Sequence, residues 1–309
     1  MIKKFKDRSG NIITKNDGQE TLLNLLYGSL PGRAVLKLLT APAVSEIAGG
    51  FCSGTASRFM IVPFIKKSGI DMSEYEPAFY RSYNEFFTRR IKAENRPIDK
   101  SPEHFISPCD SKLSVFKIDR NSVFKIKNSC YSVSSLLRCG KLARRYTGGY
   151  CMIFRLEVDD YHRYIYIDDG RKSGNRKIKG KYHTVNPIAL EFADIYKENT
   201  REYTVLHTDN FGDVVQAEVG AMMVGRIVNH DAAGEIRRGM EKGMFEFGGS
   251  TIVLLVKKDA VIIDGDILKN TADGFETVVK MGEKIGRRGN FLCLLYTSPS
   301  PTRPISISY

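Results

Sequence analysis

Hydrophobic residues in the first quarter of the chain recur with the spacing of short helices. Between Glu20 and Lys67 the apolar groups are interrupted by Pro31, Pro42, Pro63 and the pair Gly49-Gly50. We therefore expect several short helices in this segment rather than one long one. Basic side chains flank the apolar positions, as in helices that lie among lipid headgroups; they are Arg33, Lys37, Arg58, Lys66 and Lys67. An ordinary helical cap packed on the core fits the same pattern.

A further helix is predicted closely after this segment. Its apolar positions follow the i, i+3, i+4 spacing that lines one helix face, and Pro97 ends it; they are Tyr83, Phe86, Phe87, Arg90 and Ile91, with the arginine at the edge of the face.

After residue 105 the pattern changes to alternation with a period of two. In the clearest case Met152, Phe154 and Leu156 alternate with Cys151 and Ile153, which indicates a strand. Further strand candidates, separated by glycine-containing turns, are 113–117, 123–127, 203–207, 214–219, 251–256 and 260–263. We therefore expect an α+β protein with a mainly antiparallel β body and N-terminal amphipathic helices.

Composition adds one constraint on partners. The 309 residues carry a formal net charge of +12, which favours an acidic partner, either nucleic acid or an anionic membrane surface. A solvated basic surface without a specific partner explains the charge as well. No apolar stretch reaches the ~20 residues of a membrane-spanning helix. The six cysteines lack C-x-x-C spacing, so we expect neither a zinc cage nor disulfides, and a reducing compartment. Residues 288–309 are typical of a disordered or foreign tail.

One serine stands in a reactive sequence context. Gly248-Gly249-Ser250-Thr251 leads directly into the apolar run Ile252-Val253-Leu254-Leu255. The glycines leave the Gly249 carbonyl without side-chain cover and allow backbone conformations that other residues avoid. Ser250 can therefore attack the carbonyl that precedes it. By itself, such a turn is structural in most proteins.

Two other segments supply the residue types that activate a serine. His162 follows an alternating strand, and Asp110 lies in a turn before another. A histidine removes the serine proton, and a carboxylate fixes the histidine tautomer and stabilises its charged form. Asp110, His162 and Ser250 are therefore candidate catalytic residues, although each histidine or aspartate alone also fits a surface or hydrogen-bonding role.

Together these segments resemble the phosphatidylserine decarboxylase family. The resemblance covers roughly residues 20 to 287 in family order, and the Gly-Gly form of the cleavage motif is similar to the branch found in clostridia-like bacteria. The motifs that carry it are Phe86-Phe87-Thr88-Arg89-Arg90-Ile91, Arg96-Pro97-Ile98-Asp99, Ser107-Pro108-Cys109-Asp110, Asp160-Tyr161-His162-Arg163, His183-Thr184-Val185-Asn186-Pro187, Phe211-Gly212, Val219-Gly220-Ala221-Met222-Met223-Val224-Gly225, Gly248-Gly249-Ser250-Thr251 and Met281-Gly282-Glu283-Lys284-Ile285-Gly286.

The resemblance implies a proenzyme that makes its own cofactor. His162, oriented by Asp110, would deprotonate Ser250, whose oxygen attacks the Gly249 carbonyl. Elimination would then separate a beta chain 1–249 from an alpha chain 250–309, and loss of ammonia would leave a pyruvoyl group at position 250. That group would form a Schiff base with phosphatidylserine and release carbon dioxide to give phosphatidylethanolamine.

The resemblance also implies the setting of the reaction. The partner would be phosphatidylserine in an anionic membrane surface, reached peripherally from the cytoplasmic side of the cell membrane, without nucleic acid and without a metal. The alpha and beta chains would stay together as a heterodimer. The resemblance leaves open whether several heterodimers assemble into a homo-oligomer. The body would resemble a barrel-sandwich hybrid. We expect residues 1–70 to be membrane-associating helices and residues 71–287 to be the catalytic domain.

The chain departs from the family pattern at one position. A second histidine usually follows the first by three residues, but Ile165 stands there. Either His162 serves both self-cleavage and decarboxylation, or another histidine has taken the second task. His183 stands where the family more often has an aromatic residue, and it is the candidate, against a plain hydrogen-bonding role.

Two other functions fit parts of the pattern. The first is a non-catalytic module of the same β architecture that sits on membranes through the basic helices. The second keeps the pyruvoyl chemistry but takes a free amino acid as substrate. The amphipathic segment at residues 20–67 favours a lipid substrate, and a denaturing gel separates the enzyme, with two fragments, from the module, with one.

Overall fold

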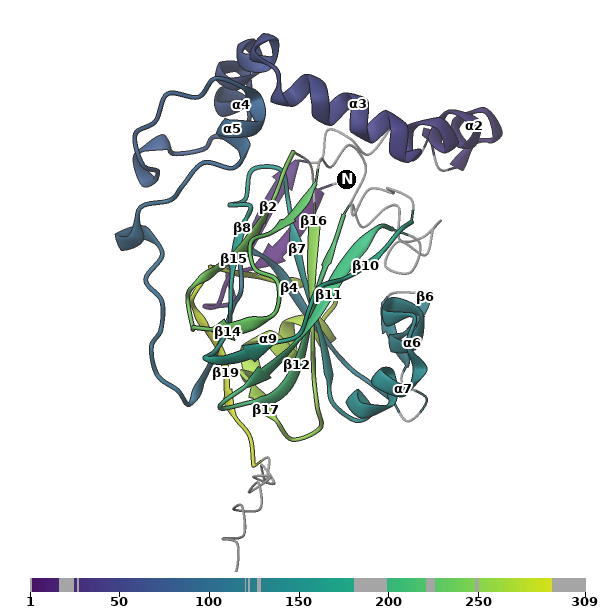
Figure 1. The fold of residues 1–309 in the computed structure, drawn as a ribbon, viewed down its shortest axis with the longest axis vertical. Coiled ribbons are helices and arrows are strands. Elements are labelled where there is room, and N and C mark those ends of the chain that lie inside the picture. The colour runs from purple at the N-terminus through teal and green to yellow at the C-terminus, as the bar shows by residue number, and fades with distance from the viewer. Residues whose placement is uncertain are drawn as a thin grey trace, which may run out of the picture.

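The computed structural model describes residues 2–16, 25–26, 28–119, 121, 123–126, 129–180, 199–220, 226–247 and 250–290. A twisted β body carries a layer of helices at one end and a smaller group of helices at one side (Figure 1). The helical elements are α2 Leu30–Leu39, α3 Pro42–Ser53, η1 Thr55–Met60, α4 Ile61–Ser68, η2 Met72–Glu74, α5 Tyr83–Phe87, η3 Ala93–Asn95, α6 Val133–Leu137, α7 Gly140–Ala143, η4 Arg144–Tyr146 and α9 Gly265–Ala272.

Most strands belong to one sheet, which has eleven strands when counted over the described residues. Its order is β14-β9-β11-β12-β16-β7-β4-β18-β1-β2, with β10 paired to β11. All of its pairings are antiparallel except that of β1 with β18. Its strands are β1 Ile2–Lys6, β2 Ile12–Asn16, β4 Ser111–Lys117, β7 Tyr150–Leu156, β9 Gly170–Lys172, β10 Arg176–Ile178, β11 Arg201–Thr208, β12 Gly212–Val219, β14 Gly234–Ile236, β16 Ser250–Val256 and β18 Glu276–Val279.

Three smaller sheets complete the body. The first is β13-β15-β8, the second β17-β19-β3 and the third β5-β6. The α+β class with a large, mostly antiparallel sheet and N-terminal helices is therefore confirmed. The strands of the small sheets are β3 His104–Ile106, β5 Val123–Ile126, β6 Ser129–Ser132, β8 Arg163–Ile165, β13 Ile227–Asn229, β15 Glu241–Phe245, β17 Val261–Ile263 and β19 Lys284–Arg288.

The central strand β7 is buried on both of its faces, whereas strict alternation of apolar and polar residues is typical of a strand with one solvent-exposed face. Met152 and Phe154 point into one hydrophobic cluster, while Cys151 and Ile153 point into another. The neighbouring strand β16 divides its side chains in the same way, with Leu254 in the first cluster and its neighbours in the second. Period-two alternation located the strand correctly. Both faces are buried because the sheet is covered on both sides.

The helical layer differs from expectation at two points. The Gly49-Gly50 pair lies inside α3 and does not end it. The helix expected through Ile91 ends at Phe87, because the following residues are drawn into extended pairing. Ile91 forms an antiparallel bridge with Tyr75, supported on either side by backbone hydrogen bonds of 2.9 and 3.0 Å.

The chain begins in the main sheet, not in the helical layer. Strands β1 and β2 form a hairpin within residues 2–16, and Phe5 of β1 pairs with Glu276 of β18. Arg8, at the turn of this hairpin, binds Asp264, Asp266 and Glu283. The hairpin therefore joins the first residues of the chain to its last described segment.

Candidate functional site

Ser250 is the first residue of β16 and is fully buried. In the sheet it lies opposite Leu156, the last residue of β7. Because β7 and β16 are antiparallel, the residues that follow Leu156 come to the same end of the sheet as Ser250. His162 reaches Ser250 for this reason, although the two are 88 positions apart in the chain.

The two side chains meet through a defined pair of atoms. Ser250 Oγ lies 3.4 Å from Nδ1 of His162, and Nε2 of His162 lies 2.9 Å from the backbone carbonyl oxygen of Glu157. A carbonyl oxygen only accepts hydrogen bonds, so Nε2 carries the ring proton and donates a hydrogen bond to the Glu157 carbonyl. The lone pair of Nδ1 is therefore directed at the serine hydroxyl.

The imidazole of His162 is enclosed on the remaining sides. It is fully buried and lies against the ring of Phe87, with centroids 4.2 Å apart. The backbone carbonyl of His162 accepts a hydrogen bond of 3.0 Å from the N–H of Phe245. The ring is thus held by α5 and by the turn after β7, and β15 holds the backbone of His162.

Burial sets the protonation state of this histidine. Burial, and to a smaller extent the nearby Arg89 guanidinium, lower the pKa of His162 to about 3, although the hydrogen bond to the Glu157 carbonyl opposes both effects in part. His162 is consequently neutral at neutral pH. A neutral histidine whose free nitrogen faces a serine hydroxyl has the arrangement of a general base.

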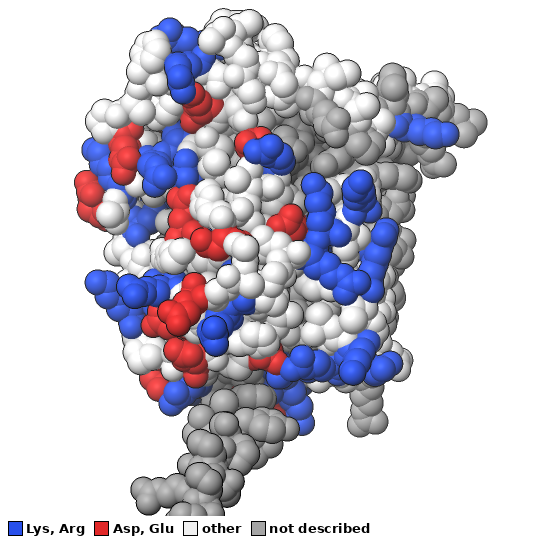
Figure 2. Space-filling model, viewed as in Figure 1, with Lys and Arg blue, Asp and Glu red and all other residues white. Residues whose placement is uncertain are grey.

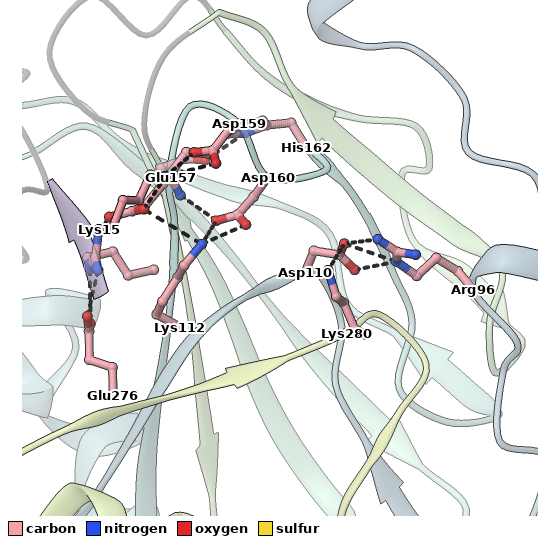
Figure 3. Close-up of polar contacts among 12 residues, drawn as sticks. Lys15, Arg96, Asp110, Lys112, Glu157, Asp159, Asp160, His162, Glu276 and Lys280 are labelled. Atoms are coloured by element: carbon pink, nitrogen blue, oxygen red, sulfur yellow. Dashed lines mark hydrogen bonds and ion pairs between the residues drawn. The ribbon is translucent and has the colours of Figure 1, made fainter. Parts of the chain in front are cut away.

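Asp110 is buried near the site but does not contact His162. Both of its carboxylate oxygens accept hydrogen bonds from Arg96, at 2.6 to 3.0 Å, and Oδ1 accepts one from the N–H of Met281 at 2.8 Å. Lys280 lies 3.6 Å from Oδ2. Figure 3 shows Asp110 facing Arg96, whereas His162 lies beside Asp159 and Asp160, with no interaction drawn between Asp110 and His162. The structure brings Ser250 and His162 together and leaves Asp110 apart.

The other residues singled out in the sequence have different outcomes. Gly249 and His183 lie outside the described residues. Ile165 is buried in β8, and its N–H donates to the carbonyl of Pro108 at 2.9 Å. The position of the missing histidine thus lies against the turn that carries Asp110.

Sequence reasoning overlooked the groups that hold the turn after β7. Glu157 supplies the carbonyl for His162, and its carboxylate meets Arg155, Lys15 and, at 3.8 Å, Lys112. The sequence contained one usable signal for these contacts. Arg155 and Glu157 are two positions apart in an alternating segment, so their side chains lie on the same face. Lys15 and Lys112 come from remote strands and gave none.

The described residues hold no group of three or more His, Cys, Asp or Glu arranged to bind a metal ion.

Comparison with known proteins identifies the family that the chain resembles. Residues 83–287 match the protein family described as Phosphatidylserine decarboxylase. The chain is 49% identical over 265 residues to phosphatidylserine decarboxylase proenzyme 2 of Clostridium acetobutylicum, which covers 85% of this chain and 91% of the relative. It is 46% identical over 271 residues to the proenzyme of Ruminiclostridium cellulolyticum, with 86% and 90% covered.

A more complete alignment extends to nearly the whole chain. The phosphatidylserine decarboxylase proenzyme of Clostridium botulinum is 40% identical over 294 residues, which are 93% of this chain and all of the relative. This match confirms the resemblance to the clostridial branch, and it decides against a non-catalytic module and against a free amino acid as substrate. The chain therefore belongs to the phosphatidylserine decarboxylase family, as a proenzyme whose pyruvoyl cofactor comes from one of its own serines.

Proposed function

We propose that Ser250 and His162 carry out the self-cleavage of this phosphatidylserine decarboxylase proenzyme between Gly249 and Ser250. The observation that carries the proposal is the 3.4 Å approach of Ser250 Oγ to the unprotonated nitrogen of a buried, neutral histidine. Such a histidine takes up the hydroxyl proton as the serine oxygen attacks.

The bond changes of the proposed cleavage balance without an external reagent other than water. His162 Nδ1 takes the Ser250 proton, Oγ bonds to the Gly249 carbonyl carbon, and the peptide C–N bond breaks as the nitrogen takes up a proton. The product is an ester. Loss of the Ser250 α-proton breaks the Cβ–Oγ bond and releases residues 1–249 as a carboxylate. The dehydroalanine left at position 250 takes up water and releases ammonia.

The site suits the resulting group. A pyruvoyl ketone at position 250 supplies an electrophile for the substrate amine and an electron sink for the leaving carboxylate. Ser250 is fully buried beside an uncharged His162, so a nitrogen able to move a proton is present in a site shielded from bulk solvent. We propose His183 as the second acid or base.

The new alpha chain has no easy route out of the fold. Its first strand, β16, is paired on one side with β12 and on the other with β7. Both neighbours belong to residues 1–249. We therefore propose that the two chains remain a heterodimer because separating them requires opening the middle of the sheet.

Asp110 keeps a place in the proposed site with a supporting task. Its carboxylate fixes Arg96 and the backbone of Met281, which belongs to the alpha chain after cleavage. Asp110 thus acts across the two chains. In this arrangement its loss slows maturation less than the loss of His162.

We further propose that residues 1–70 attach the protein to an anionic membrane surface through the helices from α2 onward, because residues 2–16 form the β1–β2 hairpin of the main sheet. The helical layer exposes large apolar side chains to solvent, among them Ile47 at 73% and Phe59 at 72%. Exposed apolar groups at this density indicate an interaction surface. None of the helices in the described part of the chain is long and apolar enough to cross a bilayer, so the proposed attachment is peripheral.

Charge on the body supports the same proposal. Figure 2 shows Lys and Arg gathered over the side that carries β10, α6 and α7. Basic side chains near an anionic bilayer each contribute on the order of 1 kcal/mol. The exposed ones in these segments are Arg138, Lys141, Arg144, Arg145, Arg176, Lys177 and Lys179.

Two finer assignments remain proposals. We place the catalytic domain at residues 71–287, which the family match to residues 83–287 supports. We also propose that the large sheet and its partner sheets form a barrel-sandwich hybrid, supported by burial of β7 and β16 on both faces.

Intact-mass measurement of the purified protein tests the proposed cleavage. We expect two masses, one for residues 1–249 and one for a chain that begins with a pyruvoyl group at position 250. Ser250→Ala should give a single mass, since no oxygen remains to attack. Cleavage of Ser250→Ala at the same bond would overturn the proposal.

A further inference from the structure

The His162 ring depends on one short turn for its orientation. The carbonyl oxygen of Glu157 accepts a hydrogen bond from His162 Nε2 at 2.9 Å and another from the N–H of Asp160 at 3.0 Å. The N–H of Glu157 in turn donates to Oδ2 of Asp160 at 2.7 Å. The turn is therefore closed in both directions between residues 157 and 160, and any rotation of the Glu157 peptide moves the acceptor of His162.

Buried charges fix the two carboxylates of this turn. Lys112 Nζ lies 2.7 Å from both oxygens of Asp160 and 3.8 Å from Glu157. Arg155 Nη1 lies 3.0 Å from Oε1 of Glu157. Burial would raise the pKa of Glu157, but Arg155, Lys112 and Lys15 outweigh it and hold the pKa well below its usual range. Glu157 is thus a permanent anion among cations.

The cations come from distant parts of the chain. Lys15 reaches from β2 of the N-terminal hairpin to Glu157 at 2.9 Å and to Asp159 at 2.7 Å. Arg155 also binds Glu276 of β18, a strand of the proposed alpha chain. Figure 3 shows these side chains converging on the turn from several elements. The N-terminal hairpin, the His162 turn and the alpha chain are thereby held in one cluster.

We propose that Lys15, Lys112 and Arg155 are positioning residues for self-cleavage, because they hold the Glu157 carbonyl where it fixes the tautomer of His162. The cluster thus performs, through a backbone carbonyl, the orienting task that a carboxylate performs in a serine–histidine–aspartate site. The inference rests on the proposed function, in which His162 is the base for Ser250.

The pH dependence of the cleavage rate distinguishes a positioning role of the cluster from a purely structural one. Loss of a structural ion pair lowers stability and slows cleavage by the same factor at every pH. Loss of positioning also loosens the enclosure of His162 and lets its pKa rise toward its ordinary value. The charged groups that set this pKa are Arg89 and Lys112, which lower it, and Asp159, which raises it. Removing Lys112 therefore also raises this pKa directly, whereas Lys15 is not among these groups, so a pH-dependent fall in Lys15→Met reports on the turn itself.

The test follows self-cleavage of the full chain made by cell-free synthesis. Freshly made precursor is moved into buffers between about pH 5 and pH 8, and the two fragments are quantified on denaturing gels. For Lys112→Met we expect a rate at least about tenfold lower at neutral pH. We also expect the rate to fall further as the pH is lowered within this range, because the pKa of His162 rises above its wild-type value. Wild type should show no such fall, because its His162 has a pKa of about 3.

Two variants keep the test informative if Lys112→Met folds poorly. Lys112→Arg retains the charge and should restore most of the rate. Lys15→Met changes a side chain that is 42% exposed, and it should slow cleavage and introduce a weaker fall at low pH. Lys4→Met is the matched control, because Lys4 is exposed on the same hairpin; it should cleave like wild type.

The outcomes separate the inference from the proposed function. Wild-type rates, or rates lowered equally at every pH, in both Lys112→Met and Lys15→Met would overturn the positioning role. His162→Gln should abolish cleavage. Normal cleavage by His162→Gln would overturn the proposed function itself, whatever the lysine variants do.

Discussion

Arg96 binds both carboxylate oxygens of Asp110, at 2.6 to 3.0 Å, and the side chains of both residues are buried. A bidentate arginine leaves a carboxylate little capacity to orient a histidine. The pair instead links two segments. Arg96 directly follows η3, and Asp110 also accepts a hydrogen bond from the backbone N–H of Met281. Asp110 and His162 therefore belong to separate sets of contacts.

The first prediction concerns this pair. Asp110→Ala and Arg96→Met should each lower the free energy of unfolding by about 3–5 kcal/mol, because each leaves a buried charge without its partner. The double variant Asp110→Leu with Arg96→Met should recover much of that loss. Denaturant unfolding of uncleaved chains, all carrying Ser250→Ala, gives the comparison.

Maturation distinguishes a chemical role of Asp110 from a structural one. In chains with an intact Ser250, equal slowing by Asp110→Ala and Arg96→Met would assign Asp110 to stability. Slower cleavage by Asp110→Ala alone would assign it to the reaction. Both variants should cleave faster than His162→Ala, which has lost the base.

The second prediction concerns acid stability. His162 is buried with a pKa of about 3 against an ordinary value of 6.5. Between these two pH values the histidine is protonated in the unfolded chain and neutral in the folded chain. The stability that this histidine contributes is complete above pH 6.5 and is lost as the pH falls toward 3. Between about pH 7 and pH 4 the loss amounts to about 3 kcal/mol.

The measurement compares Ser250→Ala with Ser250→Ala/His162→Gln, neither of which is expected to cleave. Other groups titrate equally in both chains, so the difference between their unfolding free energies isolates His162. The difference should change steadily across this pH range. A constant difference would show that the histidine is accessible to protons in the folded state.

The third prediction concerns membrane attachment. Ile47→Ser should weaken binding to vesicles that contain phosphatidylserine at least about tenfold, since an inserted isoleucine contributes about 1.5–3 kcal/mol. Ile262→Ser is the matched control, because Ile262 is 44% exposed on β17, at the end of the body away from the helical layer (Figure 1).

Vesicle flotation at low and high salt provides the readout. Binding should fall with salt, because the basic contribution is screened over about 10 Å at 0.1 M. Equal losses for Ile47→Ser and Ile262→Ser would place the membrane surface elsewhere.

The sequence predicted strands better than contacts between them. Alternation and the apolar run after Ser250 identified β7 and β16, because a strand within a buried sheet leaves a local pattern. The helix through Ile91 was wrong for a physical reason that no local pattern contains. The backbone of Arg90 is hydrogen bonded to Glu76, and this tertiary pairing overrides helix propensity.

The site shows the same division. Ser250 and His162 were found as residue types, and their approach follows from the antiparallel neighbours β7 and β16. The expected link from Asp110 to His162 is absent, because Arg96, 14 residues earlier, already occupies the carboxylate. The partners of Glu157 lie far away in the chain, and Lys15 is 142 residues from it. Ion pairs over such separations are set by the fold.

The last prediction concerns the family histidine that Ile165 replaces. Self-cleavage needs a base for Ser250, whereas decarboxylation needs an acid for the substrate carbon, and different residues can meet the two demands. If His183 supplies the acid, His183→Ala should cleave into two chains like wild type yet turn over phosphatidylserine at least about a hundredfold more slowly. The two measurements are the gel pattern and the release of carbon dioxide by the same preparation.

Restoring the family histidine at position 165 completes the test. The backbone of Ile165 is hydrogen bonded to Pro108, so a histidine at position 165 would lie beside the turn that carries Asp110. His183→Ala with Ile165→His should therefore recover part of the turnover, while Ile165→His alone should change cleavage little. Normal turnover by His183→Ala would show that the proton comes from His162, whose Nδ1 already faces position 250, or from a bound water, and would overturn the role of His183.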